Sequence, residues 1–118
     1  MNTRQTVERY FDLLRNAGAW DAMLADDIDF TRLTTPAKRV TGKTAYLEAT
    51  RRFYASIASL NIRELVVEGE RAFALTEYLI RMPSGDRFES YVAELFTVRD
   101  TKISALSICF DLSPYPKG

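Results

Sequence analysis

A chain of 118 residues that is 47% hydrophobic can bury one core without disulfide bonds, so we expect a single domain over residues 1–118. Its 16 basic and 16 acidic residues are evenly scattered, which argues against a nucleic-acid partner and against a polybasic membrane anchor. The absence of histidine excludes zinc sites built on histidine and every Ser-His or Cys-His nucleophile.

The N-terminus and the single cysteine indicate a compartment. The first residues, MNTRQTVERY, carry charge where a signal peptide is apolar. No run approaches the about 20 apolar residues of a membrane span. Cys109 has no partner for an intramolecular disulfide, which favours a reducing environment. We therefore expect a cytoplasmic protein without a membrane partner.

The first half of the chain is predicted to be mainly helical. Asn2 and Gln5 have the spacing of a capping box, and apolar residues recur at helical spacing until Gly18. Residues 19–27 predict a second, shorter helix, which is followed by a short strand at 28–33 and a proline-containing loop at 34–42. A third helix is expected over residues 43–57, where one face is apolar.

The second half of the chain changes to the two-residue period of β-strands. Four runs, at residues 60–68, 72–82, 87–98 and 102–111, are joined by connections short enough for hairpins. This pattern predicts an antiparallel meander after about three helices. Helices first and strands afterwards are typical of an α+β domain in which helices cover one face of a bent sheet.

Glu94 stands out because it lies in the middle of an otherwise apolar strand, ESYVAELFTV. If residues 83–86 form the turn of the central hairpin, Met82 pairs with Arg87. Glu77 and Glu94 are then diagonal neighbours on one face, roughly 7 Å apart. Desolvation and like charge would raise the pKa of at least one of the two carboxyls. Proton transfer near neutral pH would then become possible.

The segments TVERYFDLLRNAGAWDAMLADDIDF, VTG and AELFTVRDTKISALSICFD resemble the nuclear transport factor 2-like superfamily, which includes ketosteroid isomerase and the SnoaL-like polyketide cyclases. The resemblance covers nearly the whole chain and rests on the order and spacing of elements. It implies a cone-shaped half barrel, in which a strongly bent, mostly antiparallel sheet wraps around the helices and leaves a pocket open at one end. Thr101 lies where the family commonly has a left-handed glycine, so we expect a strained or different turn there.

The resemblance implies roles for individual residues. Tyr10 resembles the helix-one tyrosine that donates a hydrogen bond to the substrate oxyanion in the isomerase branch, and Glu94 falls where that branch has a protonated aspartic acid. Arg32 occupies the position of the general base, and a guanidinium cannot abstract a proton. A replacement base would have to be Glu77 or Asp29, and Glu77 is preferred because of its predicted face.

Two functions remain open from the sequence. The first is a small-molecule-binding protein with an apolar pocket that carries a few polar groups. The second is an isomerase-, cyclase- or dehydratase-type enzyme that uses a carboxylate base and a Tyr/Glu oxyanion site. Because Arg32 stands at the position of the general base, the small-molecule-binding function is favoured over the enzyme. The candidate catalytic residues are Glu94, Tyr10 and Glu77, and the candidate ligand-binding residues are Arg32, Arg81, Phe110 and Phe53.

The candidate residues also have a purely structural interpretation. Tyr10 would then pack in the core, while Glu77 and Glu94 would form buried ion pairs with Arg32 and Arg81.

The expected partners are a small ligand and a second copy of the chain. We expect a small hydrophobic ligand bearing a carboxylate or a phenol, and neither a cofactor nor a metal. An apolar patch on the other face of the sheet predicts a homodimer; by the register above it comprises Tyr78, Ile80, Tyr91, Ala93 and Leu95.

Overall fold

Two α-helices and six strands make up the computed structural model, which describes residues 1–115. The helices are α1 (Thr3–Arg15) and α2 (Lys43–Ser56), and one 3-10 turn, η1, spans Trp20–Met23. The strands are β1 (Leu24–Arg32), β2 (Lys38–Thr41), β3 (Ile57–Glu68), β4 (Arg71–Arg81), β5 (Arg87–Arg99) and β6 (Lys102–Phe110). Neither helix is long and apolar enough to cross a membrane, as far as the described residues go.

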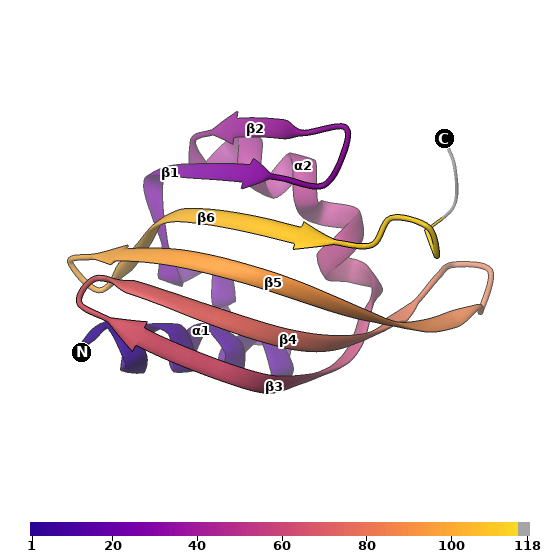
Figure 1. Ribbon diagram of the computed structural model, residues 1–118, viewed down its shortest axis with the longest axis horizontal. Coiled ribbons are helices and arrows are strands. Elements are labelled where there is room, and N and C mark those ends of the chain that lie inside the picture. Colours follow the sequence, from indigo (N-terminus) through magenta and orange to yellow (C-terminus); the bar gives the residue numbers. More distant parts are fainter. Residues whose placement is uncertain (116–118) are drawn as a thin grey trace.

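The strands form one mixed sheet in the order β2-β1-β6-β5-β4-β3. All neighbouring strands are antiparallel except β1 and β6, which run parallel. Figure 1 shows the sheet from its uncovered face, with α1 and α2 both behind it. We call the helix-covered side the inner face and the other side the outer face. The prediction of an α+β fold with helices on one face of a mostly antiparallel sheet is confirmed.

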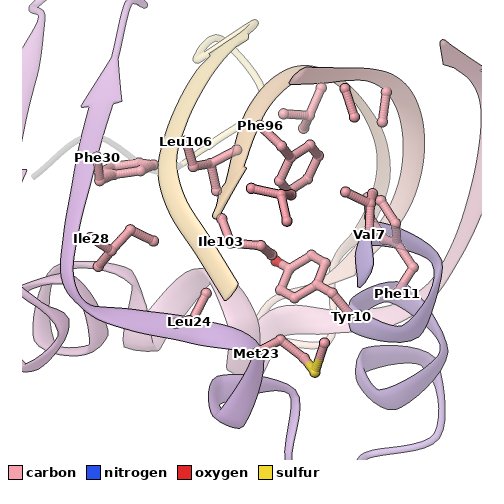
Figure 2. Close-up of a cluster of buried hydrophobic side chains, with 14 of the residues drawn as sticks. Val7, Tyr10, Phe11, Met23, Leu24, Ile28, Phe30, Phe96, Ile103 and Leu106 are labelled. Atoms are coloured by element: carbon pink, nitrogen blue, oxygen red, sulfur yellow. The ribbon is translucent and has the colours of Figure 1, made fainter. Parts of the chain in front are cut away.

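Helix α1 begins where the sequence predicts. The Asn2 side chain accepts a hydrogen bond from the Gln5 backbone N–H, and the Gln5 side chain accepts one from the Asn2 backbone N–H. This capping box satisfies two N–H groups that would otherwise lack partners. One face of the helix buries Val7, Tyr10 and Phe11, which Figure 2 shows against side chains of β1, β5 and β6. Burial of a side chain such as Phe11 contributes roughly 2–3 kcal/mol to folding.

The prediction of about three helices is wrong, because the second one is reduced to the single turn η1. Leu24 already belongs to β1 and pairs with Ile103 of β6. The register then shifts between Leu24 and Asp29, which leaves Asp26 and Asp27 exposed. Aspartate is a poor helix former, so pairing with β6 prevails over helix extension. Strand β2 was expected to be loop, and it forms by pairing with β1.

The loop of the β4–β5 hairpin contains three residues, where the sequence predicted four. The Met82 N–H donates to the Asp86 carbonyl and the Gly85 N–H donates to the Met82 carbonyl, both at 2.8 Å. Gly85 has a φ of 93°, the left-handed position that such a loop reserves for glycine. Met82 therefore faces Asp86 and not Arg87, and the register differs from the predicted one by one residue.

This one-residue difference changes the face on which Glu77 lies. Glu94 pairs with Ala74, and Glu77 pairs with Tyr91. Because successive side chains of a strand point to opposite faces, a slip of one residue exchanges the faces. Glu94 is buried on the inner face and Glu77 lies on the outer face, so the prediction that they share a face is wrong.

Candidate functional site

A cavity of about 320 Å³ lies between α2 and the inner face of the sheet. This volume falls in the range of small-molecule sites, roughly 300–1000 Å³. Its apolar walls come from α2, β1, β5, β6 and the segment after β6, and include Phe30, Phe53, Val92, Leu106, Ile108, Phe110 and Leu112. Its polar lining residues are Arg32, Lys38, Tyr46, Thr50, Arg52, Tyr54, Ser56, Glu94 and Tyr115. The cavity is therefore mostly apolar with a limited set of polar groups.

Glu94 is the carboxyl group of the cavity wall. Its side chain is buried, and the Tyr78 hydroxyl donates a hydrogen bond of 2.7 Å to its Oε1. It forms no salt bridge with any residue between 1 and 115. Burial raises the pKa of Glu94 from 4.5 to about 7, although the hydrogen bond from Tyr78 opposes the rise. Such a carboxyl can hold or release a proton near neutral pH.

Three tyrosine hydroxyls form a hydrogen-bonded chain that joins α1 to α2. The hydroxyl oxygens of Tyr10 and Tyr54 are 2.7 Å apart, and the Tyr54 hydroxyl also bonds to that of Tyr46. Burial, reinforced by the nearby charge of Glu94, raises the pKa of all three well above the usual value. The three hydroxyls therefore remain protonated and able to donate hydrogen bonds at physiological pH.

The ring of Tyr54 is also fixed by aromatic stacking. Trp20 stacks on it with a centroid distance of 3.9 Å and an interplanar angle of 23°. A hydrogen-bond donor whose ring is fixed in this way loses less entropy when it binds a ligand. Tyr54 is therefore a preorganised hydrogen-bonding group in the cavity wall.

The structure brings four of the seven predicted site residues to the cavity: Glu94, Arg32, Phe53 and Phe110. Tyr10 is buried one hydrogen bond behind Tyr54 and does not line the cavity. Tyr46 and Tyr54 line the cavity instead.

The two remaining candidates lie outside the cavity. Arg81 is exposed at the end of β4, and Glu77 forms a salt bridge of 3.1 Å with Arg63 on the outer face. Asp29, the other possible base, is bonded at 3.0 and 2.8 Å to the guanidinium of Arg39, which lowers its pKa. The expected second carboxyl beside Glu94 is therefore absent from the part of the cavity wall that residues 1–115 form.

The cavity tyrosines were not among the site residues predicted from the sequence. Tyr46 and Tyr54 are eight residues apart on α2 and therefore share a helix face with Thr50. That spacing is visible in the sequence and was used only to predict the helix. Tyr78 was assigned to the outer face because of the register error, and it is buried on the inner face.

The cavity offers no metal centre within the described residues. No group of three or more Cys, Asp or Glu side chains between residues 1 and 115 could hold a metal ion. Its polar groups are hydroxyls, cations and one carboxyl, which suit hydrogen bonding to an organic molecule.

Comparison with known proteins agrees with the fold described above. A mixed sheet packed on two helices in this order is the nuclear transport factor 2-like fold, which similar solved structures share. The chain belongs to the SnoaL-like domain family, whose model matches residues 7–106. No curated protein sequence matches the chain.

Three solved structures illustrate the similarity. A protein from Jannaschia sp. CCS1, provisionally named a SnoaL-like polyketide cyclase, has a TM-score of 0.77 and 17% identity, with 95% of this chain and 87% of that one covered. A provisionally named ketosteroid isomerase from Kribbella flavida DSM 17836 has a TM-score of 0.73 and 23% identity, with 98% and 82% covered. An epoxide hydrolase of the LEH-like type from M. tuberculosis has a TM-score of 0.75 and 20% identity, with 94% and 84% covered. At these identities the similarity shows a common fold.

Proposed function

We propose that the protein binds a small, mostly apolar molecule in the cavity between α2 and the sheet. The observation that carries the proposal is the position of Glu94, a buried carboxyl with a pKa raised to about 7, in the wall of a cavity large enough for a ring-sized ligand. The hydroxyls of Tyr46 and Tyr54 and the guanidinium of Arg32 supply further polar contacts. A few polar groups in an apolar cavity fix the orientation of a ligand.

A thermal-shift screen tests this proposal. Hydrophobic carboxylic acids and phenols are added to the protein, and we expect at least one of them to raise Tm through binding to the folded state. Ala49→Trp places a large ring at an exposed position on the cavity rim and should abolish the shift. Ala45→Trp, at an exposed position of α2 outside this cavity, is the matched control. No shift with any compound, or equal shifts with Ala49→Trp, contradicts the proposal.

A second candidate function is an isomerase-, cyclase- or dehydratase-type reaction that needs no cofactor. The raised pKa of Glu94 favours it, because a carboxylate with a pKa of about 7 is an effective base at neutral pH. Glu94 would remove a proton from the carbon beside a ligand carbonyl and return it, while Tyr54 donates a hydrogen bond to the enolate oxygen. The same fold supports unrelated reactions, so this reaction needs its own test.

Deuterium exchange provides the test of catalysis. The ketone 2-tetralone is incubated with the protein in D₂O, and the loss of its α-proton signals is followed by NMR. Enzyme activity predicts exchange faster than in buffer and a loss of that acceleration in Glu94→Gln. Exchange at the buffer rate across pH 6–8 contradicts enzymatic proton transfer for this class of ketone.

We also propose that the protein acts in a reducing compartment, the cytoplasm. Cys109, the only cysteine, is free and exposed on the outer face. A secreted protein would expose such a thiol to oxidation.

A further inference from the structure

The cavity is lined by more cationic than acidic side chains. Three cationic side chains line it, those of Arg32, Lys38 and Arg52, and Glu94 is the only carboxyl among the lining residues. None of the three cations forms a salt bridge with the described part of the chain. Arg32 and Lys38 are direct partners in the β1–β2 register, so their side chains project from the same face of the sheet. The end of the cavity at Arg32 and Lys38 therefore carries positive charge that no salt bridge within residues 1–115 neutralises.

Arg32 has hydrogen-bonding capacity that the protein leaves unused. Its Nη2 donates to the Pro36 carbonyl at 2.9 Å, which fixes one side of the guanidinium. Its Nε is buried and has no hydrogen-bond partner among residues 1–115. A buried donor without an acceptor is costly, so natural structures rarely keep one without a reason. The forked donors of a guanidinium match the two oxygens of a carboxylate.

Sheet register places Arg32 and Glu94 in one row. Both pair with Ile108, Arg32 from β1 on one side and Glu94 from β5 on the other. Directly paired residues point to the same face, so all three side chains face the cavity, which each of them lines. Two strand spacings separate the backbones of Arg32 and Glu94, a distance of roughly 10 Å. The row therefore has a cationic end, an apolar middle and a carboxyl end.

We propose that the ligand is an apolar, ring-containing monocarboxylate whose carboxylate binds to Arg32, while its opposite end carries a hydroxyl or carbonyl group that contacts Glu94. This inference rests on the proposed binding function and specifies the chemical class and the orientation of the ligand. The body of the ligand lies over Ile108. The reverse orientation brings two acidic groups together at Glu94 and leaves Nε of Arg32 without an acceptor.

Calorimetry with matched probes tests the orientation in the unmodified protein. The probes are 6-hydroxy-2-naphthoate, its neutral carboxamide, and 2-naphthol, which lacks the carboxylate. We expect the acid to bind at least about tenfold more tightly than the amide, since a charge-assisted bidentate contact replaces a neutral one. Equal affinity for acid and amide overturns the inference and leaves the proposed binding function intact. Failure of all three probes and of the thermal-shift screen overturns both.

Variants then assign the effect to Arg32. Arg32→Gln should weaken binding of the acid at least about tenfold and change the Kd of the amide less than about twofold. Arg32→Lys keeps the charge without the fork and should give an intermediate affinity. Arg81→Gln, an exposed arginine outside the cavity, is the matched control and should change neither Kd. Equal loss of acid and amide affinity in Arg32→Gln assigns a structural role to Arg32 and overturns the inference.

Discussion

Glu94 makes the stability of the folded chain depend on pH. Its carboxyl has a pKa of about 7 in the folded protein and an ordinary pKa of 4.5 when the chain is unfolded. The folded state therefore holds this proton more tightly than the unfolded state. Below pH 4.5 both states are protonated and burial of the group carries no penalty from its charge. As the pH rises from 4.5 to 7, this side chain reduces the free energy of unfolding by roughly 3 kcal/mol.

The variant Glu94→Gln tests this dependence. Glutamine is neutral at every pH, and its side-chain carbonyl can still accept the hydrogen bond from Tyr78. We expect the variant to gain roughly 3 kcal/mol relative to wild type between pH 4.5 and pH 8, as measured by urea unfolding at several pH values. Glu48→Gln, at an exposed position of α2 without a salt bridge among residues 1–115, should follow the wild-type curve. Parallel pH profiles for wild type and Glu94→Gln would show that the carboxyl is not desolvated as described.

At the scale of the element, the β5–β6 hairpin contains a residue unsuited to its backbone. Asp100 and Thr101 form the two-residue loop between Arg99 and Lys102, and have φ values of 50° and 61°. Two positive φ values in a row define a type I′ turn, whose second position is favoured by glycine. A β-branched residue in the left-handed region is strained by roughly 1–2 kcal/mol. The strain expected at Thr101 is thus present in the structure.

Replacement of Thr101 by glycine should relieve this strain. We expect Thr101→Gly to raise the free energy of unfolding by roughly 1 kcal/mol, as measured by thermal or urea unfolding. Thr41→Gly, at an exposed strand position without positive φ, should lower it, because glycine gains entropy in the unfolded chain. A loss of stability in Thr101→Gly would mean that its side chain makes contacts that outweigh the backbone strain.

The β4–β5 hairpin explains why some features could be predicted from the sequence and others could not. The capping box and the helix from Lys43 were predicted correctly, because they depend on local spacing alone. The face of Glu77 depended on the length of one loop, and a loop of three residues instead of four reversed it. Gly85 was the available signal, since a glycine after Pro-Ser favours the three-residue loop.

Other features had no local signal in the sequence. Strand β2, KRVT, contains one apolar residue, and its extended form depends on pairing with β1. The hydrogen bond between Tyr10 and Tyr54 joins residues 44 positions apart, so only the packing of α1 near α2 brings them together.

At the scale of the whole molecule, the outer face of the sheet has exposed apolar side chains. Val66, Phe73 and Leu95 are register partners across β3, β4 and β5, and their exposed fractions are 59%, 39% and 36%. Tyr91 is 50% exposed on the same face. The predicted patch was partly wrong, because Tyr78 and Ile80 are buried on the inner face. A contiguous apolar surface of this kind is typical of an interface.

We expect two copies of the chain to associate through this outer face. Phe73→Lys places a charge at the centre of the row and should shift the protein toward monomer by at least about tenfold in dissociation constant. Sedimentation equilibrium over a range of concentrations measures the shift. Ala45→Lys, on the exposed side of α2, is the control and should leave the association unchanged. A wild-type protein that is monomeric at 100-fold dilution and at high concentration alike would contradict the expected dimer.

The titration of Glu94 also has a consequence for binding measurements. The chain has no histidine that would titrate near neutral pH. At pH 7, Glu94 is neutral in about half of the molecules and charged in the other half. A carboxylate ligand prefers the neutral form, so each molecule that binds should draw up to about half a proton from the buffer at this pH. The apparent enthalpy should then differ between phosphate and Tris, in proportion to their heats of ionisation, and Glu94→Gln should remove the difference.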